Sequence, residues 1–265
     1  MNTAMNPGMG MAGGVSAEQY FAVARAAQDR VEEHETGHIR QAAAILAERM
    51  LSGGVVQVFG TGHSRAFCME LAGRAGGLVP IHAMWLDDLA LAGRYAAPEV
   101  RDATFERRPE IARDLVDLYD VRAEDAFVVV SNSGRNGATV EMALIALERH
   151  LPLVVVTSKE HSAGVESRHP SGHRLLELGD VVIDNGAPSG DAVLPVGQDT
   201  RVCAVSSLTG AWIAQALTAE IVARYGEHGE APPVLVSANL DGADDHNRVL
   251  SARYGARIGD WGRQP

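Results

Sequence analysis

Short apolar runs alternate with helical repeats along most of this chain. Five runs rich in Val, Ile and Leu are the length of buried strands, and the segments between them carry apolar residues three or four positions apart. Alternation of this kind predicts an α/β fold, a doubly wound parallel sheet with helices on both faces. The expected strands are residues 55–59, 78–84, 126–130, 153–156 and 181–183.

Helical spacing also occurs before the first strand and after the last one. Apolar residues recur between positions 20 and 31 and again between 39 and 50, so we expect two N-terminal helices, the first capped by Ser16. The last helix should bury Trp212, Ile213, Leu217 and Ile221 on one face. Residues 185–199 are rich in Gly and Pro and predict an extended loop. The other expected helices are 65–74, 109–119, 136–150 and 205–225.

The pattern predicts one domain with extensions at both ends. Residues 1–15 are rich in Met, Gly and Asn without a basic start or an apolar run, so we expect a disordered N-terminus and not a signal peptide. Residues 16–265 should form a single domain, with N-terminal helices, a core over about 35–225 and a C-terminal extension over 226–265. No run approaches the ~20 apolar residues of a membrane span. With only Cys68 and Cys203, a disulfide framework is excluded, and we expect a cytoplasmic protein.

Charge and histidine spacing narrow the classes of partner. The net charge of −11 leaves no basic stripe for a polyanion, so neither nucleic acid nor a membrane surface is expected as a partner. His169 and His173 have the spacing of two ligands on one helix face, but Pro170 and Gly172 between them argue against a helix. We therefore expect no metal and no other cofactor.

Hydroxyl groups and glycines gather where three predicted strands end. The carboxyl ends of parallel strands share one edge of a sheet, and the first turn of a helix there offers unpaired N–H groups and a positive dipole end. Each loop alone is equally explained as a tight turn with a helix cap. Together they predict a site for a phosphorylated or otherwise anionic ligand. The loops are Gly60-Thr61-Gly62-His63-Ser64, Ser131-Asn132-Ser133-Gly134 and Thr157-Ser158.

Through these motifs the chain resembles the sugar isomerase (SIS) domain family of phosphosugar-binding proteins. The resemblance covers about residues 35–225 and rests mainly on Ser131-Asn132-Ser133-Gly134 with Thr139 downstream, supported by the Gly60 loop. Residues 74–80 and 237–242 give a nearer resemblance to a bacterial group of stand-alone SIS proteins. The resemblance implies a flavodoxin-like sheet of five parallel strands, and homodimers or homotetramers whose sites borrow residues across subunits.

The resemblance also implies roles for the loop residues. Ser131, Ser133 and Thr139 would hold the phosphate, while the Gly60 loop would line the sugar. Ser206 stands just before the last helix, where it either contacts the ligand or caps the helix. The predicted binding residues are Gly60, Thr61, Gly62, Ser64, Ser131, Asn132, Ser133, Thr139, Thr157, Ser158 and Ser206.

Three side chains are candidates for proton transfer. Isomerisation through an enediol needs a base that moves a proton between neighbouring carbons and a donor that opens the sugar ring. The resemblance implies a glutamate on the helix after the first loop, which is Glu70 here, although a solvated helix carboxylate is the plain alternative. His63 lies inside the glycine loop, either as a proton shuttle or as a helix cap or anion contact. His246, in a distal polar segment, either serves its own or a neighbouring site or lies in an exposed turn.

Two classes of function fit these features. The first is an enzyme that interconverts the aldose and ketose forms of a phosphorylated monosaccharide; deamination or ether cleavage of an amino-sugar phosphate would use the same cradle. A sulfonated sugar also fits, because the cradle recognises a tetrahedral anion. The second is a non-catalytic sensor that reports sugar-phosphate binding to a protein partner. A base placed against the ligand would favour the enzyme, and donors without a base would favour the sensor.

Overall fold

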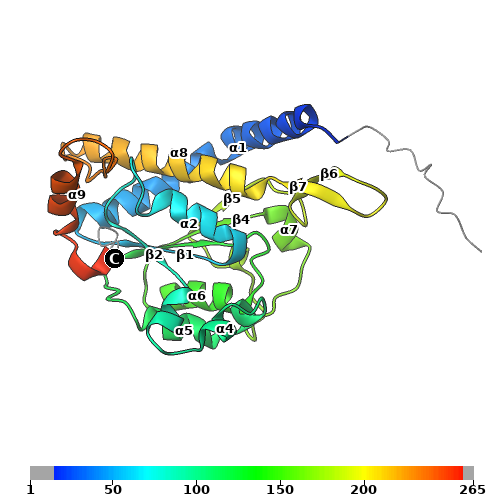
Figure 1. The fold of residues 1–265 in the computed structure, drawn as a ribbon, viewed down its shortest axis with the longest axis horizontal. Coiled ribbons are helices and arrows are strands. Elements are labelled where there is room, and N and C mark those ends of the chain that lie inside the picture. The colour runs from blue at the N-terminus through cyan, green and yellow to red at the C-terminus, as the bar shows by residue number, and fades with distance from the viewer. Residues whose placement is uncertain (1–14, 259–265) are drawn as a thin grey trace, which may run out of the picture.

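A computed structural model describes residues 15–258 of the chain, so nearly all of the predicted disordered segment 1–15 lies outside the described residues. A parallel sheet with the strand order β2-β1-β3-β4-β5 forms the centre (Figure 1). This confirms the predicted doubly wound α/β fold. The strands are β1 Val56–Gly60, β2 Ile81–Met84, β3 Ala126–Val130, β4 Leu153–Thr157 and β5 Val181–Asp184.

Helices cover both faces of the sheet, which is why its strands are almost continuously apolar. One face packs against α1 Ala17–Leu51, α2 Arg65–Leu71 and α8 Ser206–Glu227 (Figure 1). The other face packs against α5 Glu110–Val116 and α6 Gly137–Glu148. Side chains alternate along each strand, so Val58 points to the first layer while Phe59 points to the second.

One helix, not two, precedes the sheet. The expected break near residue 35 is absent because the buried stripe of α1 continues through it, with Glu35 between Val31 and Ile39. Glu35 is only 6% exposed, and its carboxylate accepts a hydrogen bond from the backbone N of Asp184 at 3.1 Å. A buried acid thus interrupts the apolar pattern in the sequence without interrupting the helix.

A hairpin replaces part of the loop expected over residues 185–199. Strands β6 Ala192–Pro195 and β7 Arg201–Ala204 pair antiparallel and lie along the N-terminal half of α1 (Figure 1). The Tyr20 hydroxyl on α1 donates a hydrogen bond to the carbonyl of Ala204 at 3.0 Å. In α8 the expected buried face is present except for Trp212, which is 47% exposed.

The C-terminal extension folds over the amino ends of the strands. Helix α9 Ala243–Ser251 and the short turn η4 Gly255–Ile258 pack Leu250 and Ile258 against Val55, which precedes β1. Within residues 15–258, no helix has the length and apolar character that crossing a bilayer requires. The shorter elements are η1 Gly62–Ser64, α3 Asp87–Leu91, α4 Ala97–Val100, η2 Phe105–Arg107, α7 Lys159–Ala163 and η3 Leu175–Glu177.

Candidate functional site

The strand order places a crevice between the carboxyl ends of β1 and β3. These strands are neighbours, yet the helices that follow them, α2 and α6, cover opposite faces of the sheet. The two loops therefore diverge at this point and leave the edge between them open. Both glycine- and serine-rich loops predicted from the sequence begin here.

Four predicted residues converge on a small cavity at this crevice: His63, Ser64, Asn132 and Ser206. The cavity measures about 20 Å³, which is room for one water, so any larger ligand would lie at its mouth. His63, the middle residue of η1, is exposed there. The remaining lining residues are Phe67, Val130, Val156, Asn185, Ser207 and Gly210.

The loop from β3 to α6 has the features of an anion site. Gly134 adopts a φ of +60°, and a Cβ there would lie 3.0 Å from the side chains of Leu175 and Ser162, so only glycine fits without a shift. The Ser131 hydroxyl accepts a hydrogen bond from the backbone N of Gly134 at 3.1 Å. Asn136, the N-cap residue of α6, makes no side-chain capping hydrogen bond, and among the described residues the buried Thr139 hydroxyl has no partner. Unsatisfied donors at a helix start favour an anion.

The Gly60 loop approaches its own helix closely. A Cβ on Gly60 would lie 2.9 Å from the carbonyl oxygen of Ser64, and Gly62 has a φ of +54°. Both positions therefore depend on glycine for the tight turn that presents His63. Thr61 precedes η1, and its side chain forms no capping hydrogen bond.

Three other predicted hydroxyls are engaged inside the protein. Thr157 donates to the carbonyl of Ser131 at 2.7 Å, and Ser158 donates to the carbonyl of Ala187 at 2.6 Å; both residues are fully buried. Ser206 donates to the Asp191 carboxylate at 2.6 Å while it lines the cavity. These contacts hold the neighbouring loops in place around the site.

Glu70 lies outside the cavity, farther along α2. Its carboxylate pairs with Arg74 one turn away and accepts a hydrogen bond from the Gln215 amide at 3.0 Å. Gln215 is five residues beyond the cavity-lining Gly210 on α8, a shift of about 7.5 Å along the helix. Glu70 therefore ties α2 to α8 in this structure.

His246 lies at the opposite edge of the sheet. It belongs to α9, and its Nε2 is 3.1 Å from the carbonyl oxygen of Val234. Because α9 packs at the amino ends of the strands, His246 does not approach the crevice of its own chain. Its predicted catalytic role would require the site of a neighbouring subunit.

Sequence reasoning missed Asn185, which lines the cavity from the end of β5. It is 4% exposed and its amide donates to the Asn132 side-chain oxygen at 2.7 Å. This pair orients Asn132 beside His63 in the cavity wall. Asn185 directly follows a strand, so the rule that found the other three loops would have found it too.

The two histidines with metal-ligand spacing face separate carboxylates. His169 Nε2 lies 2.8 Å from a carboxylate oxygen of Glu141, and His173 Nδ1 lies 3.8 Å from Glu177. Among residues 15–258, no three His, Cys, Asp or Glu side chains are grouped as metal ligands. His169 instead fastens the segment between α7 and η3 to α6.

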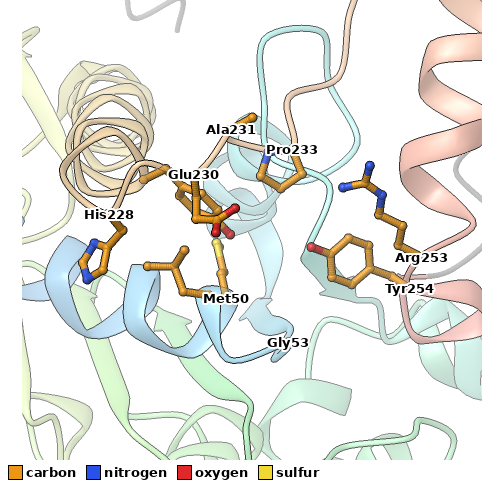
Figure 2. A pocket seen from close by; sticks show the side chains of 10 residues that line it. Met50, Gly53, His228, Glu230, Ala231, Pro233, Arg253 and Tyr254 are labelled. Carbon is orange, nitrogen blue, oxygen red and sulfur yellow. The ribbon is translucent and has the colours of Figure 1, made fainter.

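A larger cavity lies far from these motifs, at the amino ends of the strands. It measures about 530 Å³, and Figure 2 shows Glu230 on one side of it and Arg253 with Tyr254 on the other. The floor is formed by Met50 and Gly53 at the end of α1. None of the predicted site residues lines this cavity.

Comparisons with known proteins agree with the fold. The SIS domain family matches residues 19–158. A UPF0309 protein of Listeria innocua is 38% identical over 231 residues, which are 87% of this chain and 92% of the relative. A UPF0309 protein of Geobacillus thermodenitrificans is 37% identical over 243 residues, or 91% and 96% of the two chains.

Solved structures share the fold at low sequence identity. A phosphoheptose isomerase from Francisella tularensis superimposes with a TM-score of 0.53 at 17% identity, covering 78% of this chain and 98% of the isomerase. The Vibrio vulnificus NanR protein, complexed with ManNAc-6P, superimposes with a TM-score of 0.50 at 14% identity, covering 91% and 69%. At this level of identity the likeness extends to the fold alone.

Proposed function

Because this chain belongs to the SIS domain family, we propose that it binds a phosphorylated sugar at the crevice between β1 and β3 and interconverts its aldose and ketose forms. One observation carries the proposal. The uncapped start of α6, with the unpartnered Thr139 hydroxyl, stands at the same strand ends as a cavity lined by His63 and Asn132. An anion subsite and a proton-transfer group thus share one edge.

The phosphate would sit at the first turn of α6. Ser131, Ser133 and the helix N–H groups would surround it with neutral donors, as at other helix starts that bind phosphate. The sugar would then extend over the Gly60 loop toward the cavity. Two proteins with this fold support the assignment, since one is a phosphoheptose isomerase and the other is complexed with ManNAc-6P.

His63 is the proton-transfer group that the geometry favours. It is exposed at the cavity, while the Glu70 carboxylate is occupied by Arg74 and Gln215. An imidazole can accept the proton from one carbon and return it to the next. Asn132, fixed by Asn185, supplies a donor toward a developing enediolate oxygen. Glu70 is the competing candidate, and His246 would act only from a partner subunit.

Binding is tested first, by thermal shift against aldose, ketose and amino-sugar phosphates together with their unphosphorylated and sulfonated analogues. A ligand that binds the native state raises the melting temperature. We expect a shift for phosphorylated sugars that Ser133→Ala reduces and that Ser52→Ala, a control at the far edge, leaves intact. Unphosphorylated sugars acting as strongly as their phosphates would contradict the anion subsite.

Turnover is tested by proton exchange in heavy water with the sugar phosphate that binds. We expect His63→Gln to keep binding but to lower kcat by roughly 10²- to 10⁴-fold, the usual loss for a general acid–base group. Glu70→Gln should retain most turnover, and the exposed control His34→Gln should retain all of it. Loss of exchange in Glu70→Gln alone would move the catalytic role to Glu70. Binding without exchange in the native protein would replace the isomerase by a sensor.

A further inference from the structure

Three arginines gather beside the start of α6. Arg135 continues the loop after Gly134, and its carbonyl accepts a hydrogen bond from the backbone N of Arg168 at 2.8 Å. The Arg168 guanidinium donates to the Asn136 side-chain oxygen at 2.8 Å. Arg107 borders the same turn, because a Cβ on Gly137 would lie 2.2 Å from its carbonyl oxygen. We refer to Arg107, Arg135 and Arg168 as the arginine cluster.

The arginine cluster lacks the carboxylates that neutralise its neighbours. Arg108 and Arg113 each bond to two glutamates nearby. Within residues 15–258, no member of the cluster has a carboxylate oxygen within 4.0 Å. Glu106 is the nearest acid in sequence, but it accepts a hydrogen bond from the Asn136 amide at 2.6 Å. In a chain with 34 acidic and 23 basic side chains, three unpaired arginines together need an explanation.

Two further observations indicate that an anion would stabilise the cluster. The Arg135 Nε is buried and has no hydrogen-bond partner among the described residues. A buried donor left unpaired is costly, and an anion would satisfy it. Desolvation lowers the pKa of Arg168, the positive charges of Arg135 and Arg107 lower that pKa further, and the negative charge of Glu106 raises it in part. The three charges therefore repel one another, and a bound anion would remove that repulsion.

The backbone segment that carries Arg168 is held in place by its neighbours. His169, the neighbour of Arg168, pairs with the buried Glu141 carboxylate at 2.8 Å and with the Ser171 hydroxyl at 2.8 Å. The backbone N of Leu175 also donates to the carbonyl of Gly134 at 2.8 Å. The segment that carries Arg168 is thus bound to α6 and to the loop Ser131-Asn132-Ser133-Gly134, which we call the serine loop, at several points.

We propose that the arginine cluster is a second anion subsite, so that the ligand of this crevice is a sugar phosphate that carries another anionic group. This inference rests on the proposed function. The serine loop offers neutral hydroxyl and N–H donors for one phosphate, whereas the cluster offers formal positive charge. Ser133 and Arg135 are two residues apart, at most about 7 Å along the backbone, so one monosaccharide spans both subsites. The second group is a phosphate or a carboxylate, both of which guanidinium groups bind.

The test compares four probes by calorimetry: fructose 6-phosphate, fructose 1,6-bisphosphate, 6-phosphogluconate and pyrophosphate. We expect the native protein to bind the bisphosphate or the phosphorylated acid at least tenfold more tightly than the monophosphate. The double variant Arg107→Gln/Arg168→Gln should lose that advantage and keep its affinity for the monophosphate. Arg101→Gln, an exposed arginine outside the cluster, is the matched control and should behave as the native protein.

The outcomes separate this inference from the proposed function. Equal affinity for singly and doubly anionic sugars, or an advantage that survives in the double variant, would overturn the second subsite and leave sugar-phosphate binding standing. Pyrophosphate binding that depends on the arginines, without binding of any sugar phosphate, would support the subsite as an anion site and overturn the proposed function. The bisphosphate and 6-phosphogluconate arms distinguish a phosphate from a carboxylate as the second group.

Discussion

At the scale of single residues, a chain of buried polar side chains runs between two strands and the C-terminal turn. Asp125 is fully buried and accepts hydrogen bonds from the backbone N of Val55 at 2.8 Å and the Gln57 amide at 3.1 Å. Arg257 also bonds to it, which ties η4 to the amino edge of the sheet. Gln57 in turn contacts His82 Nδ1 at 2.9 Å. Each buried polar group forms a hydrogen bond with the next. Removal of one side chain therefore leaves a buried partner without a hydrogen bond, which costs free energy.

The buried His82 makes the free energy of unfolding depend on pH. Burial lowers its pKa from the ordinary 6.5 to about 4, although Asp125 raises that pKa in part. Between these two values only the unfolded chain takes up the proton, so stability is complete above pH 6.5 and falls as the pH drops toward 4. The loss attributable to this side chain is up to about 3 kcal/mol.

Urea unfolding at pH 7 and pH 4.5 measures this loss. We expect the difference between the two pH values to be smaller in His82→Gln than in the native protein, because glutamine does not titrate. The exposed control His34→Gln should keep the native difference. The same pH dependence in native protein and His82→Gln would show that His82 is not responsible.

At the scale of secondary-structure elements, the strands and their loops could be predicted, but the length of α1 could not. Buried parallel strands are apolar runs, and their carboxyl ends lie together whatever the details of packing. Glu35 made α1 read as two helices, because a glutamate is not expected in a buried stripe. The burial of Glu35 depends on Asp184 and Lys159, which are distant in sequence. The pair of Glu70 with Arg74 was visible as a four-residue spacing, whereas its contact with Gln215 was not.

Glu35 should therefore contribute to stability although it is charged and buried. We expect Glu35→Ala to lower the free energy of unfolding by roughly 1–3 kcal/mol, because the backbone N of Asp184 and the Lys159 ammonium lose their acceptor. Glu32→Ala, on the exposed side of the same helix, is the control and should change it by less than about 0.5 kcal/mol. Equal unfolding midpoints for the two variants in urea would contradict this role.

At the scale of the whole molecule, the two ends of the sheet are built differently. The carboxyl edge gathers the glycine and serine loops. The amino edge is covered by α9 and η4 (Figure 1), and the larger cavity lies there. The position of the C-terminal extension could not be predicted, since it depends on contacts such as Arg257 with Asp125, 132 residues apart. His246, expected to serve its own or a neighbouring site or to lie in an exposed turn, lies in this arrangement at the amino edge, away from the crevice of its own chain.

The remaining expectation at this scale is a homodimer or homotetramer. The N-terminal half of α1 exposes Phe21 to 55%, with Val23 also exposed on the same helix. We expect light scattering to give two or four times the 28.1 kDa chain mass, and Phe21→Ser to lower it. Leu240→Ser, an exposed apolar residue of the C-terminal extension, should leave the mass unchanged. A native mass of one chain would contradict the expectation.

The partnership of α1 with α8 has a consequence for synthesis on the ribosome. The two helices lie side by side, yet α1 ends at Leu51 and α8 begins at Ser206 (Figure 1). At translation rates of about 5–20 residues per second, synthesis of the residues between α1 and α8 takes on the order of 10–30 s. During this time the apolar stripe of α1 cannot pack against α8. Nascent chains halted before residue 206 should therefore recruit chaperones through Ile39, Leu46 and Met50, and release them once α8 has emerged.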